Sequence, residues 1–310
     1  MGHQLLLCSS IPHQNYIQTV STLRALTGVL NPQDISTYTL LTKPHNVFKP
    51  KFEPGKVNQI EQFYMKCTTI WADSASEKLD LAVPILKDGP DVLVNRLFNG
   101  ETVKYWTLQI SDIPNAGKNP VLAHNFHEST LVHHHTQRPV KEENVQANGE
   151  VENSAKESNK EDDLMEIDGS EAVKDEKIDV NIEQKDPDNA EVATKDSFLQ
   201  FIEDLGYDMV NQYWLKGIRF FHGDIVIEIF KLFVRDDDGQ IIDGKLKLSL
   251  LDESNTFQVK AYINFPKGAS VDLINQGTKD LTKLKESLKN LFELEVPDRM
   301  YMDSRVARVQ

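Results

Sequence analysis

Four β-strand patterns that follow one another between residues 208 and 265 constrain the fold of this chain more than any other feature. They read DMVNQYWLKGIRFF, DIVIEIFKLFV, GKLKLSLL and TFQVKAYINF, and they are connected through HGD, DDDG and ESN. Strand patterns of this length, joined by tight Gly, Asp and Asn turns, predict an antiparallel meander. Long strands twist and curl, and closing into a barrel removes their exposed edges. We therefore predict an α+β fold that is mainly β, a multistranded antiparallel β-barrel with flanking helices.

Further strand and helix patterns lie on both sides of this meander. Upstream strand patterns cover four segments, 4–8, 34–44, 59–71 and 106–114. A helix pattern runs from Asn15 to Thr27 with Gly28 as its C-cap, and SFLQFIEDLGY predicts a short helix that ends near Gly206. Downstream, TKDLTKLKESLKNLF predicts a helix with a buried leucine stripe, and ELEV predicts a short strand that Pro297 ends.

A long acidic segment interrupts these patterns. Between Lys141 and Asp196 there are 7 lysines against 19 acidic residues, so the segment carries −12 of the chain's formal charge of −14. It contains no aromatic residue, and such a composition cannot bury enough surface to offset the entropy cost of ordering. We predict one barrel domain in two parts, 1–120 and 196–310, with a disordered acidic insertion at 121–195. Closing a loop of this length is tolerable because its entropy cost grows only logarithmically.

Composition argues against several classes of protein. Outside the acidic segment the charge is nearly balanced, so the chain lacks the clustered Lys and Arg that nucleic-acid binding requires. Cys8 and Cys67 are the only cysteines and lie in apolar strand patterns, so we expect inert core thiols and no disulfide framework. No membrane span, signal peptide or lipid-anchor signal is evident. We expect an intracellular protein with no direct sequence-specific DNA binding and no membrane attachment.

Neither a metal site nor a catalytic site is predicted. Five of the nine histidines fall in HNFHESTLVHHHTQRP, but consecutive histidines in a polar segment lack the fixed geometry that metal ligands need. A barrel that hydrolyses triphosphates would need inward-facing glutamates and cations that recur at period two. The strand from Asp224 places Lys231 on the face opposite Glu228, and Glu293 has no cation on its face. We interpret these charges as solvent-facing and expect no cofactor; the alternative is a metal-dependent triphosphatase-type hydrolase.

Three stretches together resemble one known family. QLLLCSSI…YIQTVSTLRALTG, WTLQISDIPNAG and VPDRMYMDSRVA occur in this order and are similar to the fungal form of subunit eighteen of the Mediator complex. The resemblance implies a barrel like that of fungal RNA triphosphatase, a triphosphate-tunnel-like fold, without the enzymatic activity. It also implies a nuclear, non-enzymatic subunit of the Mediator head module, a coactivator that bridges regulators and RNA polymerase II at promoters. The implied partners are subunit twenty, the C-terminal helix of subunit eight and other head-module subunits.

The tail that follows Pro297 is unusually rich in specific side chains for a chain end. It contains Asp298, Arg299, Asp303 and Arg305 between apolar residues. One interpretation is structural: the arginines pin the tail across the barrel wall, and Asp–Arg pairs a few residues apart satisfy each other. The other is that the tail forms part of a surface that faces a partner. We favour the structural interpretation.

The first helix carries a face with little charge. We expect the apolar positions Ile17, Val20, Leu23 and Leu26 to face the barrel, which leaves Tyr16, Thr19 and Thr22 on a flanking face. A solvated helical face normally carries Lys and Glu. Either this surface simply tolerates threonine, or it is a contact strip for a neighbouring Mediator subunit.

Overall fold

A computed structural model describes residues 1–46, 62–71, 79–86, 89, 91–95, 105–117, 119–131, 197–236 and 245–306. The predicted acidic segment and the histidines at 133–135 lie outside these residues. Among the described residues, no helix is both long and apolar enough to cross a membrane.

The structure contains ten strands and three α-helices within the described residues. The strands are β1 (Gly2–Ile11), β2 (Gln33–Pro44), β3 (Met65–Ile70), β4 (Val92–Asn95), β5 (Trp106–Ser111), β6 (Leu122–Leu131), β7 (Tyr207–His222), β8 (Ile225–Arg235), β9 (Lys245–Leu250) and β10 (Phe257–Pro266). The helices are α1 (Tyr16–Thr27), α2 (Ser197–Asp204) and α3 (Val271–Leu288), with short 3-10 helices η1 (His13–Asn15) and η3 (Arg299–Met302).

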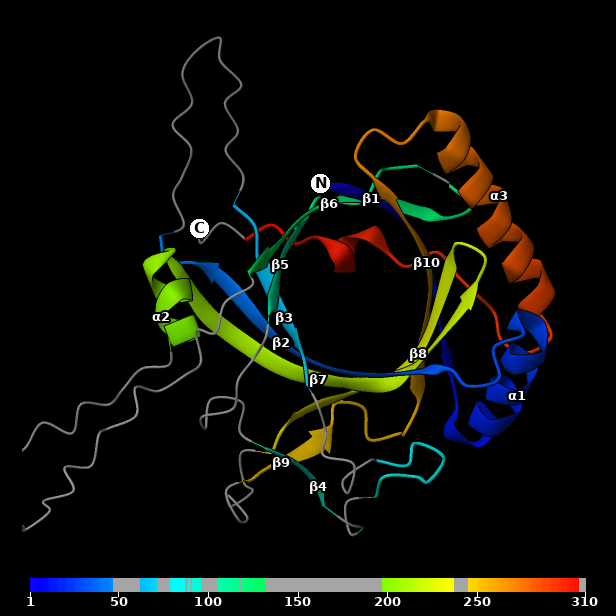
Figure 1. The fold of residues 1–310 in the computed structure, drawn as a ribbon, viewed down its shortest axis with the longest axis horizontal. Helices are drawn as coiled ribbons and strands as arrows, with labels where there is room; N and C mark the ends of the chain where they lie inside the picture. Colours follow the sequence, from blue (N-terminus) through cyan, green and yellow to red (C-terminus); the bar gives the residue numbers. More distant parts are fainter. Residues whose placement is uncertain are drawn as a thin grey trace, which may run out of the picture. The chain divides into compact units, whose positions relative to one another are not determined.

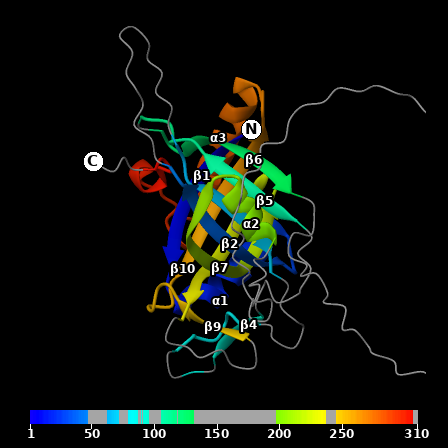
Figure 2. The same cartoon turned by 90° about the vertical axis from the view of Figure 1, so that its left-hand side faces the viewer.

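Eight antiparallel strands close into a barrel. The order around the ring is β10-β1-β6-β5-β3-β2-β7-β8, and β8 pairs with β10 to complete it (Figure 1). Strands β9 and β4 extend from β8 as a two-stranded arm outside the ring (Figure 2). The predicted barrel of mainly β structure is therefore confirmed.

Strands from both sides of the acidic segment form this ring as two blocks, β1, β6, β5, β3 and β2 in one and β7, β8 and β10 in the other, and the blocks meet at two seams. β2 pairs with β7 over the full length of β2, and β1 pairs with β10 over ten residues. Neither half of the chain could close the barrel alone. Without the second half, β1 and β2 would each keep an unpaired edge.

Helices cover the outside of the barrel on two sides. In Figure 1, α1 and α3 lie against one wall, and α2 lies at the opposite side. Leu23 of α1 and Leu284 of α3 join one core cluster with Leu5 of β1 and Ile227 of β8. A second cluster joins Phe198 of α2 to the tryptophans and aliphatic residues of β2, β3, β5 and β7. The hydrophobic core therefore lies between the barrel wall and its helices.

Local sequence signals explain how these elements begin and end. Gly28 caps α1 in the left-handed conformation, with φ of 72°, and its N–H donates to the carbonyl of Arg24. Ser270 caps the start of α3 by accepting a hydrogen bond from the backbone N–H of Leu273. The β7–β8 hairpin turns through Gly223 and Asp224, and Gly223 has φ of 59°.

Three boundaries differ from the predictions. Strand β6 occupies 122–131, inside the segment predicted as disordered, because its alternating side chains pair with the edges of β1 and β5. Helix α3 starts at Val271, seven residues before the predicted start, at the Ser270 cap. The predicted strand ELEV is only an isolated bridge between Glu295 and Cys8, because the chain leaves the sheet on both sides of it.

Candidate functional site

The lumen of the barrel is lined by polar side chains. Successive residues of a strand point to opposite faces of the sheet, and residues such as Leu5, Val259 and Ile227 pack outwards against the helices. Their neighbours along each strand therefore point inwards. The inward-facing set includes Gln4, Cys8, Lys66, His124, Arg219, Glu228, Lys260, Tyr262 and Asn264.

One row of the lumen runs across four neighbouring strands. Cys8, Lys260, Glu228 and Arg219 are successive cross-strand partners on β1, β10, β8 and β7. The Nε and Nη2 atoms of Arg219 donate to Oε1 of Glu228 at 2.9 and 2.6 Å, and the hydroxyl of Tyr262 donates to the same oxygen at 3.0 Å. Glu228 is only 7% exposed. Our interpretation of Glu228 as solvent-facing is therefore wrong, because the inner face of the barrel is enclosed.

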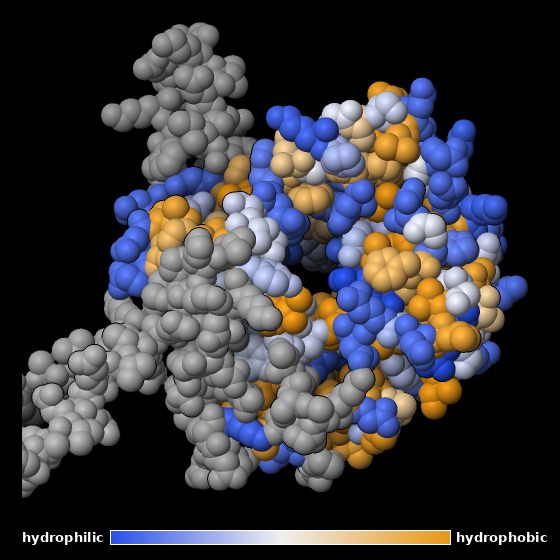
Figure 3. Space-filling model, viewed as in Figure 1, coloured by the Kyte–Doolittle hydropathy of each residue, from blue (hydrophilic) through white to orange (hydrophobic). Residues whose placement is uncertain are grey.

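Two lysines of the lumen have no such partner. Within the described part of the chain, no oxygen accepts a hydrogen bond from Lys66 or Lys260, although the amino group of Lys260 lies 4.4 Å from the centre of the Tyr262 ring. Burial lowers the pKa of both lysines, and Lys66 lowers that of Lys260 further. Lys66 is nevertheless an exposed residue, so solvent reaches its side chain. Figure 3 shows that the surface is hollowed at the centre of the ring.

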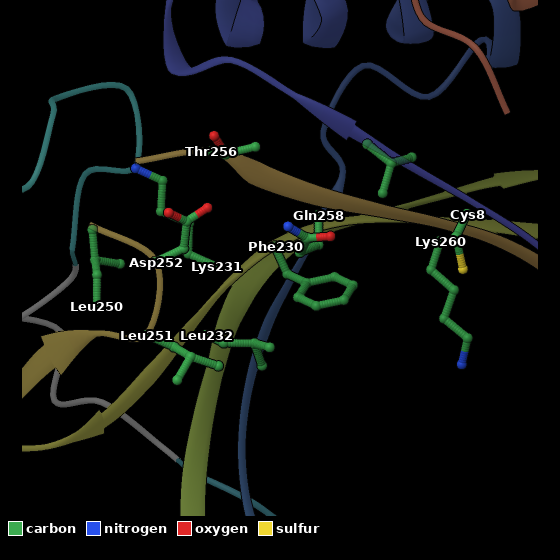
Figure 4. Close-up of a pocket in the computed structure, with 11 residues that line it drawn as sticks. Cys8, Phe230, Lys231, Leu232, Leu250, Leu251, Asp252, Thr256, Gln258 and Lys260 are labelled. Carbon is green, nitrogen blue, oxygen red and sulfur yellow. The ribbon is translucent and has the colours of Figure 1, made fainter. Parts of the chain in front are cut away.

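A cavity of about 420 Å³ lies beside this row (Figure 4). Its lining combines Cys8, Gln258 and Lys260 with the apolar side chains of Phe230 and Leu232. In Figure 4, the amino group of Lys260 points away from Asp252, the carboxylate among the labelled residues. Lys260 is therefore part of the cavity lining and does not pair with Asp252.

Lys231 lies on the other face of β8, as the sequence predicts. It is 1% exposed, and its amino group donates to Oδ1 of Asn255 at 2.9 Å and lies 3.3 Å from Nδ1 of His13. Burial lowers the pKa of Lys231 to about 8. Asn255 also bonds the backbone of Ile85 through both its amide atoms. Lys231 is therefore not solvent-facing, and it helps to hold two loops against the barrel.

The thiols are buried to different extents. Cys67 is fully buried beneath α2, and burial raises its pKa to about 12. Cys8 is half-buried and faces the lumen, where burial raises its pKa while Lys260 acts in the opposite direction. Both thiols are thus protonated at neutral pH, as expected of inert cysteines.

The hairpin register is the sequence signal that could have revealed the Arg219–Glu228 pair. In a hairpin, residues at equal distances before and after the turn lie opposite each other. His222 pairs with Ile225 next to the turn, and three residues farther along each strand Arg219 pairs with Glu228. Arg219 and Glu228 lie on different strands, so their pairing is visible only when the two strands are compared across the turn. His124 is buried in β6 rather than lying in a polar loop.

The C-terminal tail crosses one end of the barrel. Glu295 exchanges backbone hydrogen bonds with Cys8 on β1, and farther along the tail Ser304 accepts one from the N–H of Tyr64 at 2.7 Å. Between these points Met302 packs against the cluster that contains the lumen-facing residues Leu6 and Leu122. The tail is therefore fixed at both ends by its backbone.

The predicted tail residues act mainly within the tail. Asp298 caps η3 by accepting from the N–H of Met300, and Arg305 forms a paired interaction with Asp303, the shortest contact being 2.6 Å. The pKa of Asp303 is lowered, chiefly by its hydrogen bond to Arg305. The Nε atom of Arg299 is buried without a hydrogen-bond partner among the described residues. Pro297 precedes η3 and is half-buried.

The inward face of α1 differs from the prediction. Tyr16 and Thr19 are buried, and Tyr16 stacks on Phe257 with ring centres 4.2 Å apart. Ile17, expected to face the barrel, is 63% exposed. The helix is rotated because the aromatic contact with β10 fixes Tyr16 inwards. The expected strip of Tyr16, Thr19 and Thr22 therefore does not form an outer surface, and only Thr22 is exposed.

Fold and lumen together define this chain as an eight-stranded antiparallel barrel protein with a charged lumen and an outer layer of helices. Among the described residues, no three or more His, Cys, Asp or Glu side chains are arranged to hold a metal ion.

Comparison with known proteins gives a consistent result. The family model described as "Med18 protein" matches residues 3–305. The chain is 54% identical to a Debaryomyces hansenii protein and 47% identical to a Candida albicans protein, both named "Mediator of RNA polymerase II transcription subunit 18", with 99% of each chain covered. This chain belongs to the Med18 protein family, and the resemblance seen in the sequence is confirmed.

A solved structure agrees with the fold. A chain of the Schizosaccharomyces pombe Mediator head module superposes with a TM-score of 0.54 at 10% identity, covering 95% of this chain and 98% of that one. At this identity the likeness shows the barrel fold.

Replacing Lys260 by methionine should stabilise the barrel. The change removes a lysine that is enclosed without a hydrogen-bonding partner and keeps its apolar stem, so we expect a gain of about 1 kcal/mol, roughly 2–4 °C in Tm. Folding lowers the pKa of Lys260 below its ordinary 10.5. Between the folded and the unfolded pKa the unfolded state therefore binds more protons than the folded state, so the free energy of unfolding of the wild type rises with pH in this window. Thermal melts at pH 7 and 9.5 should show that the difference between variant and wild type shrinks at the higher pH. An unchanged or lower Tm at pH 7 would contradict the prediction.

Proposed function

We propose that this chain is a non-enzymatic subunit of the Mediator coactivator complex that acts in its head module to regulate RNA polymerase II transcription. The observation that carries the proposal is the family match over 3–305, together with relatives of nearly equal length that are named as Mediator subunit 18. Because RNA polymerase II transcription takes place in the nucleus, we propose that this chain is nuclear.

The proposed partners are the other subunits of the head module. We propose that it pairs with subunit twenty, that the C-terminal helix of subunit eight tethers it, and that the assembled module contacts RNA polymerase II. The fold likeness to a chain of the S. pombe head module is consistent with this assignment.

Complementation tests the proposal directly. A fungal cell that lacks its own subunit eighteen would receive this chain with an affinity tag. We expect the tagged chain to copurify with the head-module subunits and to restore transcription of Mediator-dependent genes. A chain that is stable in the nucleus yet copurifies with no Mediator subunit would refute the proposal.

The geometry of Glu228 supports a non-enzymatic role. A hydrolase on this barrel would need carboxylates free to hold a metal ion, whereas Oε1 of Glu228 already accepts three hydrogen bonds from Arg219 and Tyr262. Incubating the purified chain with nucleoside triphosphate and manganese separates the two functions. Turnover that disappears on Glu228→Gln would establish the hydrolase instead.

The outward face of α1 is the interface that we propose for a neighbouring head-module subunit. Ile17 is 63% exposed on this helix, and Leu30, which follows it, is 76% exposed. Ile17→Lys should leave folding unchanged, because the side chain is at the surface. It should weaken retention in purified head module about tenfold, as a lost apolar contact of about 1.4 kcal/mol implies.

The matched control is Asn275→Lys, which adds the same charge to an exposed position of α3. Retention of both variants at the wild-type level, measured by quantitative copurification, would exclude Ile17 from the interface. The same assay with Thr22→Lys tests the one exposed residue of the strip expected from the sequence.

A further inference from the structure

The loop at residues 79–86 carries apolar side chains, of which some are packed into the protein and others are exposed. Leu81 belongs to the core cluster of α1 and α3, and Ile85 packs against the cluster of β2, β5 and β7. Val83 is instead 56% exposed, and Leu86 is 63% exposed. Figure 1 shows this loop in cyan below α1. The inward pair anchors the loop, and the outward pair faces solvent.

A buried polar network fixes the backbone of this loop. Oδ1 of Asn255 accepts a hydrogen bond from the N–H of Ile85 at 2.9 Å, and Nδ2 of Asn255 donates to the carbonyl of Ile85 at 2.7 Å. The amino group of Lys231 donates to the same Oδ1 atom. Nε2 of His13 lies 3.1 Å from the carbonyl oxygen of Ala82. The loop is therefore held at two points, by η1 and by the turn before β10.

This network costs free energy of folding. The hydrogen-bond partners of Lys231 among the described residues are the side chains of Asn255 and His13, and neither is an acid. Burying a cation without a hydrogen-bonded acid is unfavourable, and burial lowers the pKa of Lys231, whereas the charge of Asp252 opposes this shift. An apolar residue could fill the same place in the barrel wall. What the network adds is a rigid loop, and a rigid contact surface reduces the entropy cost of binding a partner.

Two exposed carboxylates lie next to the apolar side chains of the loop. Oδ1 of Asp80 accepts a hydrogen bond from the N–H of Ala82, and Oδ1 of Asp252 accepts one from the N–H of Ser254, each at 2.9 Å. Both acids are exposed, and Asp252 lies three residues before Asn255, which binds the loop. Their turns hold the carboxylates in place. A partner that complements this surface has an apolar groove with Lys or Arg at its rim.

We propose that Val83 and Leu86 insert into an apolar groove, rimmed by Lys or Arg, on the same head-module subunit that contacts the outward face of α1. The inference rests on the proposed function and names a second part of that interface. The two surfaces are continuous, because His13, which contacts the loop, lies in η1 directly before α1. Ile17, in the first turn of α1, is also exposed. Exposed apolar side chains that gather at one place are typical of a protein interface.

Binding of the full chain to a purified head module that was assembled without it tests the proposal. Val83→Ser combined with Leu86→Ser should weaken binding about tenfold and leave the Tm unchanged, because both side chains are at the surface. The control is Val271→Ser, which removes a side chain that is 71% exposed at the start of α3 and should not change the affinity. Wild-type affinity of the double variant, or equal weakening by the control, would overturn the proposal.

Asp80→Asn combined with Asp252→Asn tests the charge beside the loop. Asparagine keeps the side-chain oxygen that accepts the backbone N–H in each turn, and it removes the negative charge. We expect about threefold weaker binding at low ionic strength and no difference at high salt, because salt screens exposed charges. Unchanged or tighter binding at low ionic strength would contradict a basic rim on the partner.

Photo-crosslinking identifies the molecule that covers the loop. A benzophenone amino acid would replace Leu86 in one sample and Ile17 in another, and each full chain would be irradiated in the assembled head module. We expect both positions to crosslink to the same subunit, at a segment that combines apolar residues with Lys or Arg. Crosslinks to a second copy of this chain, or to different subunits, would overturn the proposal and leave Mediator membership intact. A wild-type chain that does not bind the module would refute that membership and this inference with it.

Discussion

Gly217→Ala is expected to lower the free energy of unfolding by about 3 kcal/mol, because the barrel leaves no room for a β-carbon at this position. Gly217 lies in β7, paired with Ile35 of β2 on one side and with Phe230 of β8 on the other. A Cβ atom there would lie 2.3 Å from the carbonyl oxygen of Ile229 and 2.7 Å from Cα of Phe230. These are backbone atoms, so the two strands would have to separate where the ring closes.

Gly223→Ala is the matched control for this prediction. Gly223 has φ of 59° in the β7–β8 turn, and its Cβ would meet nothing within 4 Å. Its cost is therefore only the backbone strain of a left-handed alanine, about 1 kcal/mol. Urea unfolding of both variants measures the difference, and equal costs would show that the approach of β7 to β8 is looser than described.

Phe198→Ala should detach helix α2 and cost about 4 kcal/mol, within the range for removing a fully buried aromatic ring. Phe198 is 0% exposed and stacks on Trp106 with ring centres 3.8 Å apart and an angle of 4° between the planes. It is the second residue of a helix of eight residues. A helix this short is not stable alone, so its order depends on this packing.

Hydrogen exchange separates local from global effects of this change. Amides of α2 should lose protection first, while those of β1 and β10, on the other side of the barrel, should follow only the global loss of stability. Leu205→Ala removes a side chain that is 49% exposed just after the helix, and it should cost less than about 0.5 kcal/mol. A similar cost for both variants would refute the role of Phe198 as the anchor of α2.

The sequence alone determined the local structure of this protein and its family. Turn residues and alternation predicted the strands β7, β8, β9 and β10, the C-cap at Gly28 and the strand that begins at Trp106, because each depends on residues that are near one another in the chain. The predicted meander is wrong at its last step, because β10 pairs with β8 and β1 rather than with β9. Three strings of sequence carried the family resemblance. These signals are short-range, so they can be recognised without knowledge of the tertiary structure.

Only the tertiary structure decided which face of each element is enclosed. Alternation divides a strand into two faces, but it does not tell which face is open to solvent. In this barrel one face is covered by helices and the other encloses the lumen, so a charged residue such as Glu228 can be buried. The same limit applies to α1, where Tyr16 is turned inwards by its contact with Phe257, which is 241 residues later in the chain. Contacts between residues this far apart depend on closure of the ring, which the pattern of a single strand or helix does not encode.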